Sequence, residues 1–292
     1  MGIITISRGS FFRGREIAQK VAKELHHKCI SREDLLKDSK EYNIPEIDLL
    51  HALEEGPSIL DRFIHGREKY IAYIQAALLR SLRKGNVVYH GFAFHFFVKD
   101  LPCVLKVRII AELEDRIKFV MERDEISRKK AFSFIKKVDA QRERWSRKLY
   151  GIDPSDASLY DVVLHIGRIT AEDAVDTICH IIGFRQFQPT PESQRVMRNL
   201  ALAAEVKAAM MDLTPKIEVF SRDGIVTVKT DTPLGDDTEL TKKMIRVCEA
   251  VGGVKGVNIF AGSLPQSSRS SRPGRAGKST KEIVRTYFGE FG

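Results

Sequence analysis

The feature that most constrains the fold is a regular alternation of short β-branched runs with segments of helical periodicity over residues 3–182. The first run, residues 3–6, is followed by a loop with two glycines and then by a helical pattern through Ile17, Val21 and Leu25. The later runs at residues 86–89 and 104–110 are mainly apolar, which is typical of strands buried on both faces. The alternation therefore predicts an α/β fold, in which helices cover both faces of a parallel sheet.

The remaining elements of this region follow the same order. Further strands are predicted at residues 28–30, 86–89, 104–110 and 160–166. Helices are predicted within residues 32–82 and at 113–123, 128–149 and 171–182. Together these segments define a first domain over residues 1–183.

The chain changes character after residue 183. Residues 184–191 contain two prolines and are predicted to be a linker. A small α-β-β-α-β domain is predicted over residues 192–262, with a hairpin around Arg222-Asp223-Gly224 and a helix stop at Gly252-Gly253. Residues 263–292 are basic and rich in Ser, Arg, Pro and Gly, which predicts a disordered tail.

Composition excludes several classes of protein. The longest stretch without Asp, Glu, Lys or Arg is residues 85–98, too short for a bilayer that needs about 20 residues. The four cysteines lie far apart without a CxxC pair, so a disulfide framework or a zinc site is not expected. No signal peptide is evident, and reduced thiols fit a cytoplasmic protein.

The net charge of +9 is concentrated in two segments. Residues 127–150 hold nine Lys and Arg against two Asp and Glu, and residues 263–292 hold six against two. A diffuse basic surface would indicate a nucleic-acid partner. Two local concentrations instead indicate a phosphate-facing helix and a flexible tail. The tail either attracts anionic surfaces or nucleic acid without sequence specificity, or only keeps the protein in solution.

The loop after the first strand has the spacing of a phosphate-binding loop. Gly9 and Gly14 occupy the glycine positions of GxxxxGK[ST], and the loop follows a strand and opens a helix. Free N–H groups and the positive end of the helix favour an anion there. The predicted phosphate-binding residues are Arg8, Gly9, Arg13, Gly14, Arg15 and Glu16.

Substitutions in this loop leave a second interpretation open. Arg15 replaces the lysine, keeping the charge in a planar fork. Glu16 stands where Ser or Thr would bind Mg²⁺, and its carboxylate can ligate the ion but repels phosphate. Phe11 and Phe12 add bulk where the backbone should approach a ligand. In the alternative interpretation Glu16 only complements the helix dipole, and the arginines are solvated.

Residues 128–149 are predicted to form a basic helix with one apolar face. Arg142 falls on that face beside Trp145, and a buried arginine requires an anionic partner. Phosphate oxygens match the guanidinium fork, and Asp139 is the alternative partner. The apolar face consists of Ala131, Ile135, Val138, Trp145 and Leu149.

Several sequence stretches together resemble the cytidylate kinase-like proteins, a divergent branch of P-loop nucleoside monophosphate kinases. The stretches are ITISR with GREIA, REDLL, LEDRIKFVMER, and IKKVDAQRERW with LYG, and the resemblance covers residues 1–182. It implies a P-loop kinase-like fold with a five-stranded parallel sheet, a monophosphate-binding insert at about 32–82 and a lid at about 127–150. It also implies nucleotide binding with Mg²⁺ and ATP or another triphosphate.

The resemblance implies roles for particular residues as well. In such kinases the loop holds the donor phosphates, and lid arginines surround the transferred group. The implied catalytic residues are Arg15, Arg116 and Arg142. The implied lid residues are Arg123, Asp139 and Arg142, and Arg62 and Arg67 are acceptor candidates by position.

The sequence also departs from the family pattern. The branch itself carries Arg-Glu in the loop, but it is usually glycine-rich before that pair. Ser31 stands where an Asp is usual after the second strand, and His90-Gly91 stands where Gly-Arg is usual. Two functions therefore remain open. One is phosphoryl transfer to a monophosphate such as CMP, and the other is a catalytically degenerate nucleotide sensor.

Residues 192–262 resemble, more weakly, a BON domain, an α/β module implicated in binding lipids or proteins. The resemblance implies a protein or phospholipid partner and leaves a third hypothesis, an interaction protein with a retained kinase fold. No metal-binding spacing is present among the histidines. His90 and His95 at a strand end either contact a base or are partly buried.

Overall fold

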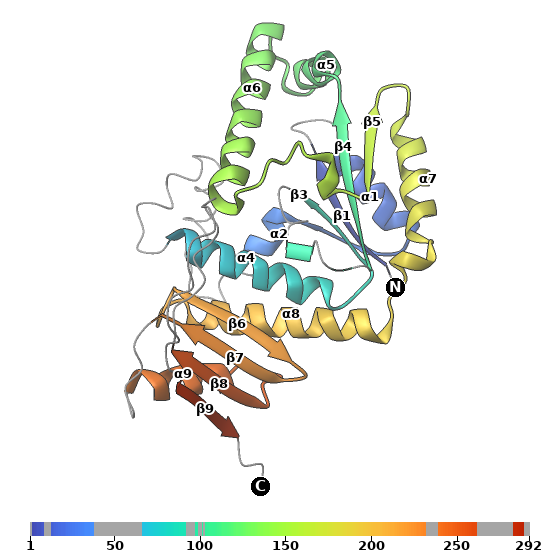
Figure 1. The fold of residues 1–292 in the computed structure, drawn as a ribbon. Coiled ribbons are helices and arrows are strands. Elements are labelled where there is room, and N and C mark those ends of the chain that lie inside the picture. The colour runs from blue at the N-terminus through green and yellow to red at the C-terminus, as the bar shows by residue number, and fades with distance from the viewer. Residues whose placement is uncertain are drawn as a thin grey trace, which may run out of the picture. The chain divides into compact units, whose positions relative to one another are not determined.

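The computed structural model describes residues 2–8, 13–37, 66–91, 97–98, 101, 103–231, 239–261 and 283–288. The chain divides into two compact units, Met1–Val196 and Met197–Gly292. Figure 1 shows the elements of both units in colours that run from the N-terminus to the C-terminus.

Unit 1 is built on five strands that all run in the same direction. The sheet order is β2-β3-β1-β4-β5, so β1 lies at the centre, between β3 and β4. The predicted five-stranded parallel sheet is therefore confirmed. The strands are β1 (Ile3–Arg8), β2 (Lys28–Ser31), β3 (Val87–Gly91), β4 (Val104–Ala111) and β5 (Val162–Ile166).

Helices cover both faces of this sheet, with α1 behind it and α4 in front of it in Figure 1. On the α1 side, Ile6 and Val107 of the sheet pack with Val21 of α1 and Ile178 of α7, and all four side chains are buried. The helices of unit 1 are α1 (Gly14–Glu24), α2 (Arg32–Lys37), α4 (Gly66–Leu82), α5 (Leu113–Asp124), α6 (Arg128–Trp145) and α7 (Ala171–Ile182).

Local capping explains why α7 begins where the sequence pattern predicts. The Thr170 side chain accepts a hydrogen bond from the Asp173 backbone N–H, and the Asp173 carboxylate accepts one from the Thr170 N–H. This capping box satisfies two backbone donors that a helix start leaves open.

The predicted helix over residues 128–149 is not one regular α-helix. It changes at Ser146 to a π-helical turn (Ser146–Tyr150), and Gly151 follows with a φ of 66°, in the left-handed region. The helical periodicity continues through this point, so the sequence pattern does not distinguish the two helix types. The prediction that Ala131, Ile135 and Trp145 are buried is confirmed.

The second unit has a smaller sheet of order β6-β7-β8-β9. A hairpin joins β6 to β7 through Asp223 and Gly224, whose φ values of 52° and 95° suit a tight turn. β7 and β8 pair in parallel, with α9 between them in the chain. The elements are α8 (Pro191–Met210), β6 (Ile217–Arg222), β7 (Ile225–Thr230), α9 (Glu239–Glu249), β8 (Gly256–Ala261) and β9 (Ile283–Phe288).

The structure differs from the sequence predictions at two further places. Within the predicted disordered tail, Ile283–Phe288 forms β9 and pairs antiparallel with β8. Its β-branched and aromatic residues favour a strand, and pairing satisfies the backbone groups at the β8 edge. Within the predicted linker 184–191, Phe187 is buried in the core of unit 1, because its ring adds apolar area to that core.

In the part of the chain that the structure describes, no helix is both long enough and apolar enough to cross a membrane.

The position of Phe187 makes a prediction about stability. Phe187→Ala is expected to lower the free energy of unfolding by about 3 kcal/mol, because it leaves a cavity in the core. Phe184→Ala, at a ring that is 39% exposed, is expected to cost less than about 1 kcal/mol. Urea unfolding followed by the fluorescence of Trp145, the single tryptophan, reports on unit 1. Equal losses in the two variants would show that the segment is a linker.

Candidate functional site

The candidate site lies at the carboxyl edge of the parallel sheet, where β1 leads toward α1. Arg8 ends β1, and its side chain and residues Gly9–Phe12 lie outside the described residues. Gly14 is buried at the first position of α1, whereas Arg13 and Arg15 on either side of it are exposed. Two cations therefore stand at the positive end of a helix that directly follows the central strand, an arrangement that attracts anions.

Glu16 is held in a chain of ion pairs that the sequence analysis missed. The Lys20 Nζ lies 2.7 Å from the Glu16 Oε1 and 2.6 Å from the Glu172 Oε1 of α7. Hydrogen bonds to Glu16 and Glu172 raise the pKa of Lys20, and the bond from Lys20 lowers the pKa of Glu172. The spacing of four residues between Glu16 and Lys20 was the sequence signal for this ion pair, because such residues are neighbours on the surface of a helix.

The residues at this edge fit a magnesium ion carried by a nucleotide better than one held by the protein. No group of three or more His, Cys, Asp or Glu side chains with metal-binding geometry occurs among the described residues. Glu16 can offer one carboxylate oxygen, since Lys20 occupies only its Oε1. Mg²⁺ commonly binds one or two carboxylates together with phosphates and water, so this donor set suffices.

The carboxyl end of β2 holds a carboxylate near the position where the family usually has Asp. The Asp34 Oδ2 accepts hydrogen bonds from the Ser31 backbone N–H at 3.0 Å and from the Ser31 Oγ at 2.7 Å. The Ser31 Oγ in turn accepts a hydrogen bond from the Asp34 N–H at 3.2 Å. Ser31 and Asp34 thus cap the start of α2 reciprocally.

Helices α5 and α6, which include the predicted lid, are joined by charged contacts. The Arg116 Nη2 on α5 donates to both oxygens of Asp139 on α6, at 2.8 and 2.7 Å. The Arg116 side chain is only 13% exposed. A small core of Ile117, Val120, Ala131 and Ile135 lies between the helices. The structure therefore brings two predicted site residues together as partners of each other.

Two other cations of this pair of helices, the predicted Arg123 and the unpredicted Arg128, have acidic neighbours as well. Arg123 donates to both oxygens of Asp124 at 2.6 Å, and this bond raises the pKa of Arg123. Arg128 bonds both oxygens of Glu114 at 3.1 and 2.8 Å and lowers the pKa of that carboxyl. The arginines of these two pairs are more exposed than Arg116, so each pair contributes little to stability.

Arg142 is half-buried on α6, three residues before the buried Trp145. The Trp145 ring lies 5.5 Å from the Tyr70 ring of α4, centroid to centroid, at an angle of 48°. The end of the lid helix is therefore anchored on α4. Of the acceptor candidates, Arg62 and the side chain of Arg67 lie outside the described residues, and so does His95.

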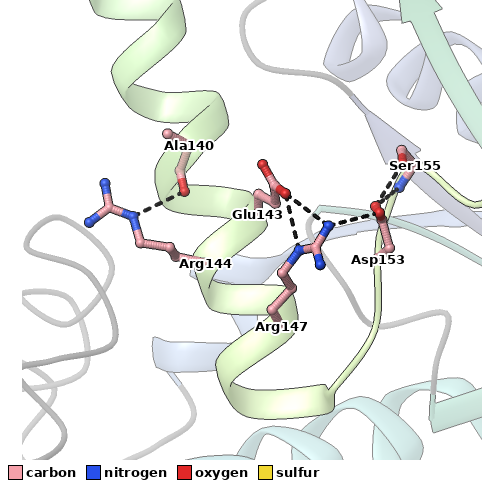
Figure 2. Close-up of polar contacts among 6 residues, drawn as sticks. All are labelled: Ala140, Glu143, Arg144, Arg147, Asp153 and Ser155. Atoms are coloured by element: carbon pink, nitrogen blue, oxygen red, sulfur yellow. Dashed lines mark hydrogen bonds and ion pairs between the residues drawn. The ribbon is translucent and has the colours of Figure 1, made fainter.

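Arg147 ties the π-helical turn to the segment that follows it, as Figure 2 shows. Its guanidinium lies 3.0 Å from Glu143 one turn earlier and 3.0 Å from the Asp153 Oδ2. The Asp153 Oδ1 accepts hydrogen bonds from the N–H and the Oγ of Ser155. The bonds from Ser155, with smaller contributions from the charges of Arg147 and Arg108, lower the pKa of Asp153.

Arg108 of β4 and Tyr160 form a polar contact beside β1 that the sequence analysis did not select. The Arg108 Nη1 donates to the Tyr160 Oη at 3.0 Å, and the Tyr160 Oη lies 3.4 Å from the Oγ of Ser7 on β1. The available signal was the pair of charged residues, Lys106 and Arg108, at alternate positions within the otherwise apolar run 104–110. His90, at the end of β3, is 4% exposed, which agrees with the interpretation of a buried histidine.

The comparisons with known proteins agree on one family. The sequence model of the cytidylate kinase-like family matches residues 3–168. A cytidylate kinase from Archaeoglobus fulgidus is 27% identical over 63% of this chain and 97% of its own length. One from Pyrobaculum islandicum is 24% identical over the same shares.

Other relatives match over shorter regions. A cytidylate kinase from Pyrococcus horikoshii is 31% identical over 32% of this chain and 48% of its own length. The match covers 55% of the Staphylothermus marinus cytidylate kinase, so the chain spans about half the length of these two relatives. A solved shikimate kinase from Bacteroides thetaiotaomicron aligns over 63% of this chain and 99% of its own, with 11% identity and a TM-score of 0.39, which is too low to add to the fold assignment.

The contact between α5 and α6 is expected to contribute to stability. In a double-mutant cycle of Arg116→Gln and Asp139→Asn, the coupling energy should be about 1 kcal/mol or more, because the arginine is largely buried. The matched cycle at the exposed pair Arg128 and Glu114 should give less than about 0.5 kcal/mol. Urea unfolding followed by Trp145 fluorescence measures both. Equal coupling energies in the two cycles would contradict a structural role specific to Arg116.

Proposed function

Because the chain belongs to the cytidylate kinase-like family, we propose that it transfers a phosphoryl group from a nucleoside triphosphate to a nucleoside monophosphate. The proposed acceptor is a CMP-like nucleotide, and ATP with Mg²⁺ is the proposed donor. The curated relatives named above are cytidylate kinases, which supports this choice of acceptor.

The observation that carries the proposal is the position of Arg13 and Arg15. Both flank the first residue of α1, immediately after the central strand of a parallel sheet, and both are exposed. Ligands of open α/β sheets bind beyond the carboxyl ends of the strands, at the place where these cations stand. Charge, helix dipole and location thus favour the same ligand, a polyphosphate.

In this proposal the residues act by positioning and charge neutralisation. Arg13 and Arg15 hold the donor phosphates against the start of α1, and Arg142 on the lid helix neutralises charge on the transferred group. Glu16 would contribute a carboxylate ligand to Mg²⁺, and the ion would supply neutralisation of charge on the donor phosphates. Arg116 acts indirectly, because it fixes α6 through Asp139.

A specific observation favours a second candidate function. Glu16 stands where a kinase loop has a hydroxyl, and it is paired with Lys20. A chain that binds nucleotide at this edge but transfers no phosphoryl group would be a nucleotide sensor. Its second unit, which resembles a BON domain, would then pass the bound state to a protein or phospholipid partner.

A turnover assay tests the first proposal. Release of ADP from ATP and Mg²⁺ is measured with each nucleoside monophosphate, and the largest kcat/KM is expected with CMP. Arg15→Ala should reduce kcat/KM by about 100-fold, as expected for loss of one group that binds developing charge. Arg185→Ala, at an exposed arginine of a 3₁₀ turn far along the chain from the loop, is the matched control and should leave kcat/KM unchanged.

Turnover that is equal in the wild type and in an Arg15→Ala/Arg142→Ala variant would overturn the kinase proposal. The sensor predicts a different pattern, in which ATP raises the melting temperature while no ADP is released with any acceptor. It also predicts that ATP changes binding to vesicles or to a captured partner. A melting temperature that does not respond to millimolar ATP, GTP or CTP would exclude both functions.

A further inference from the structure

Arg108 is a charged side chain inside the sheet of unit 1. In the parallel register it lies opposite Ser7, two residues before the loop glycine Gly9. Its neighbours Val107 and Ile109 are 0% and 2% exposed and pack into the core on the α1 side. Because side chains alternate along a strand, Arg108 and Ser7 project from the opposite face.

Three polar groups from three parts of the chain meet on that face. The Arg108 guanidinium donates to the Tyr160 Oη at 3.0 Å and lies 5.3 Å from the centroid of the Tyr160 ring. The Tyr160 hydroxyl donates to the Pro154 carbonyl at 2.9 Å and lies 3.4 Å from the Ser7 Oγ. Tyr160 and Ser7 are only 8% and 6% exposed, so the chain fixes both groups in place.

The charge of Arg108 is not neutralised by an ion pair within the described part of the chain. The neighbouring cation on the same face, Lys106, pairs with Asp161 at 3.4 Å. The charge of Arg108 also acts on the Asp153 carboxylate. Both oxygens of that carboxylate, however, already accept hydrogen bonds from Ser155 and Arg147. Arg108 is half-buried and uses one of its five N–H donors on a described group, which leaves four for a ligand or water.

We propose that Arg108, with the Ser7 hydroxyl, binds the phosphate of the acceptor monophosphate. A phosphomonoester dianion matches the planar fork of a guanidinium and supplies the missing counter-charge. The inference rests on the proposed function, which places the donor phosphates in the loop that starts two residues after Ser7. An acceptor phosphate at Arg108 is then next to the donor.

The chemistry at this position balances without any further reactant. An oxygen of the acceptor phosphate forms a bond to the terminal phosphorus of the donor. The bond from that phosphorus to its bridging oxygen breaks, and the electron pair leaves with the donor diphosphate. Arg108 binds the acceptor in this step and orients its attacking oxygen.

Binding measurements on the full chain separate this role from a structural one. Calorimetric titrations with CMP, cytidine and ATP are compared in the wild type, Arg108→Gln and Arg108→Lys. Arg108→Gln should weaken CMP binding by about 10- to 100-fold, the usual cost of a hydrogen bond to a charged group. Binding of cytidine and ATP should stay within about twofold, because neither ligand places a phosphate at Arg108. Arg108→Lys should recover part of the loss.

The same glutamine change at exposed Arg185 is the matched control and should leave all three affinities unchanged. Should Arg108→Gln fail to fold, Ser7→Ala provides the second test. It should weaken CMP by about fivefold and leave ATP unchanged, as expected for one neutral hydrogen bond. CMP binding at wild-type strength in either variant, or an equal loss of CMP and ATP, would overturn the inference.

Titration with inorganic phosphate distinguishes failure of the inference from failure of the proposed function. If the wild type binds no nucleotide, the proposed function fails. An anion site at Arg108 would still appear as phosphate binding that is lost in Arg108→Gln and kept in Arg185→Gln. Phosphate binding of equal strength in these two variants, or none in the wild type, would show that Arg108 holds no phosphate.

Discussion

The parallel pairing of β1 with both β3 and β4 is the constraint on which the rest of unit 1 depends. Because the strands run in one direction, their carboxyl ends meet at one edge of the sheet. The chain leaves β1 at this edge and enters α1 after a short loop, so the positive end of α1 lies there too. Burial of Ile4 and Ile6 on one face of β1 also directs Thr5 and Ser7 to the other face.

Two groups of described cations in unit 1 differ in their partners. Arg116, Arg123 and Arg128 bond carboxylates on α5 and α6. These carboxylates oppose their charges within the protein, and the pairs of Arg116 and Arg128 join α5 to α6. Arg13 and Arg15 are exposed beside the loop, and Arg108 lacks a described carboxylate partner. The cations of the second group are therefore the ones that the proposals assign to an incoming anion, together with Arg142 on α6.

Periodicity and local chemistry were sufficient for most of the fold. The helix over Ala171–Ile182 was predicted from its apolar repeat, and the capping box at Thr170 sets its start. The hairpin at Asp223 and Gly224 was predicted from its turn residues. Strand β9 was missed because its apolar run gains stability only from pairing with β8, a contact made across residues that are distant in sequence.

The candidate site was less predictable, because its contacts join distant segments. The likeness to a family pointed to Arg116 and Asp139 as separate site residues, and only the packing of α5 on α6 shows them bonded to each other. Arg108 and Tyr160 are separated by 52 positions, and no local pattern links them. Arg13 and Arg15 could be proposed from the sequence, because the loop and the helix start beside them are visible in the local sequence pattern.

The pairing of Lys20 bears on whether the loop can accept phosphate at all. A glutamate in place of a hydroxyl would repel a polyphosphate if its charge were unopposed. In the structure Lys20 lies 2.7 Å from Glu16, and its pKa is raised above the usual value near 10.5 by the hydrogen bonds to Glu16 and Glu172. A group with a raised pKa stays protonated at all pH values below it, so Lys20 is cationic wherever the phosphates of a nucleotide are ionised near neutrality. Glu16 therefore shares the charge of Lys20 with Glu172, and the exposed Arg13 and Arg15 bring the sum of these five side chains to one positive charge. That balance makes this edge of the sheet attractive to a polyphosphate despite the substitution of the hydroxyl.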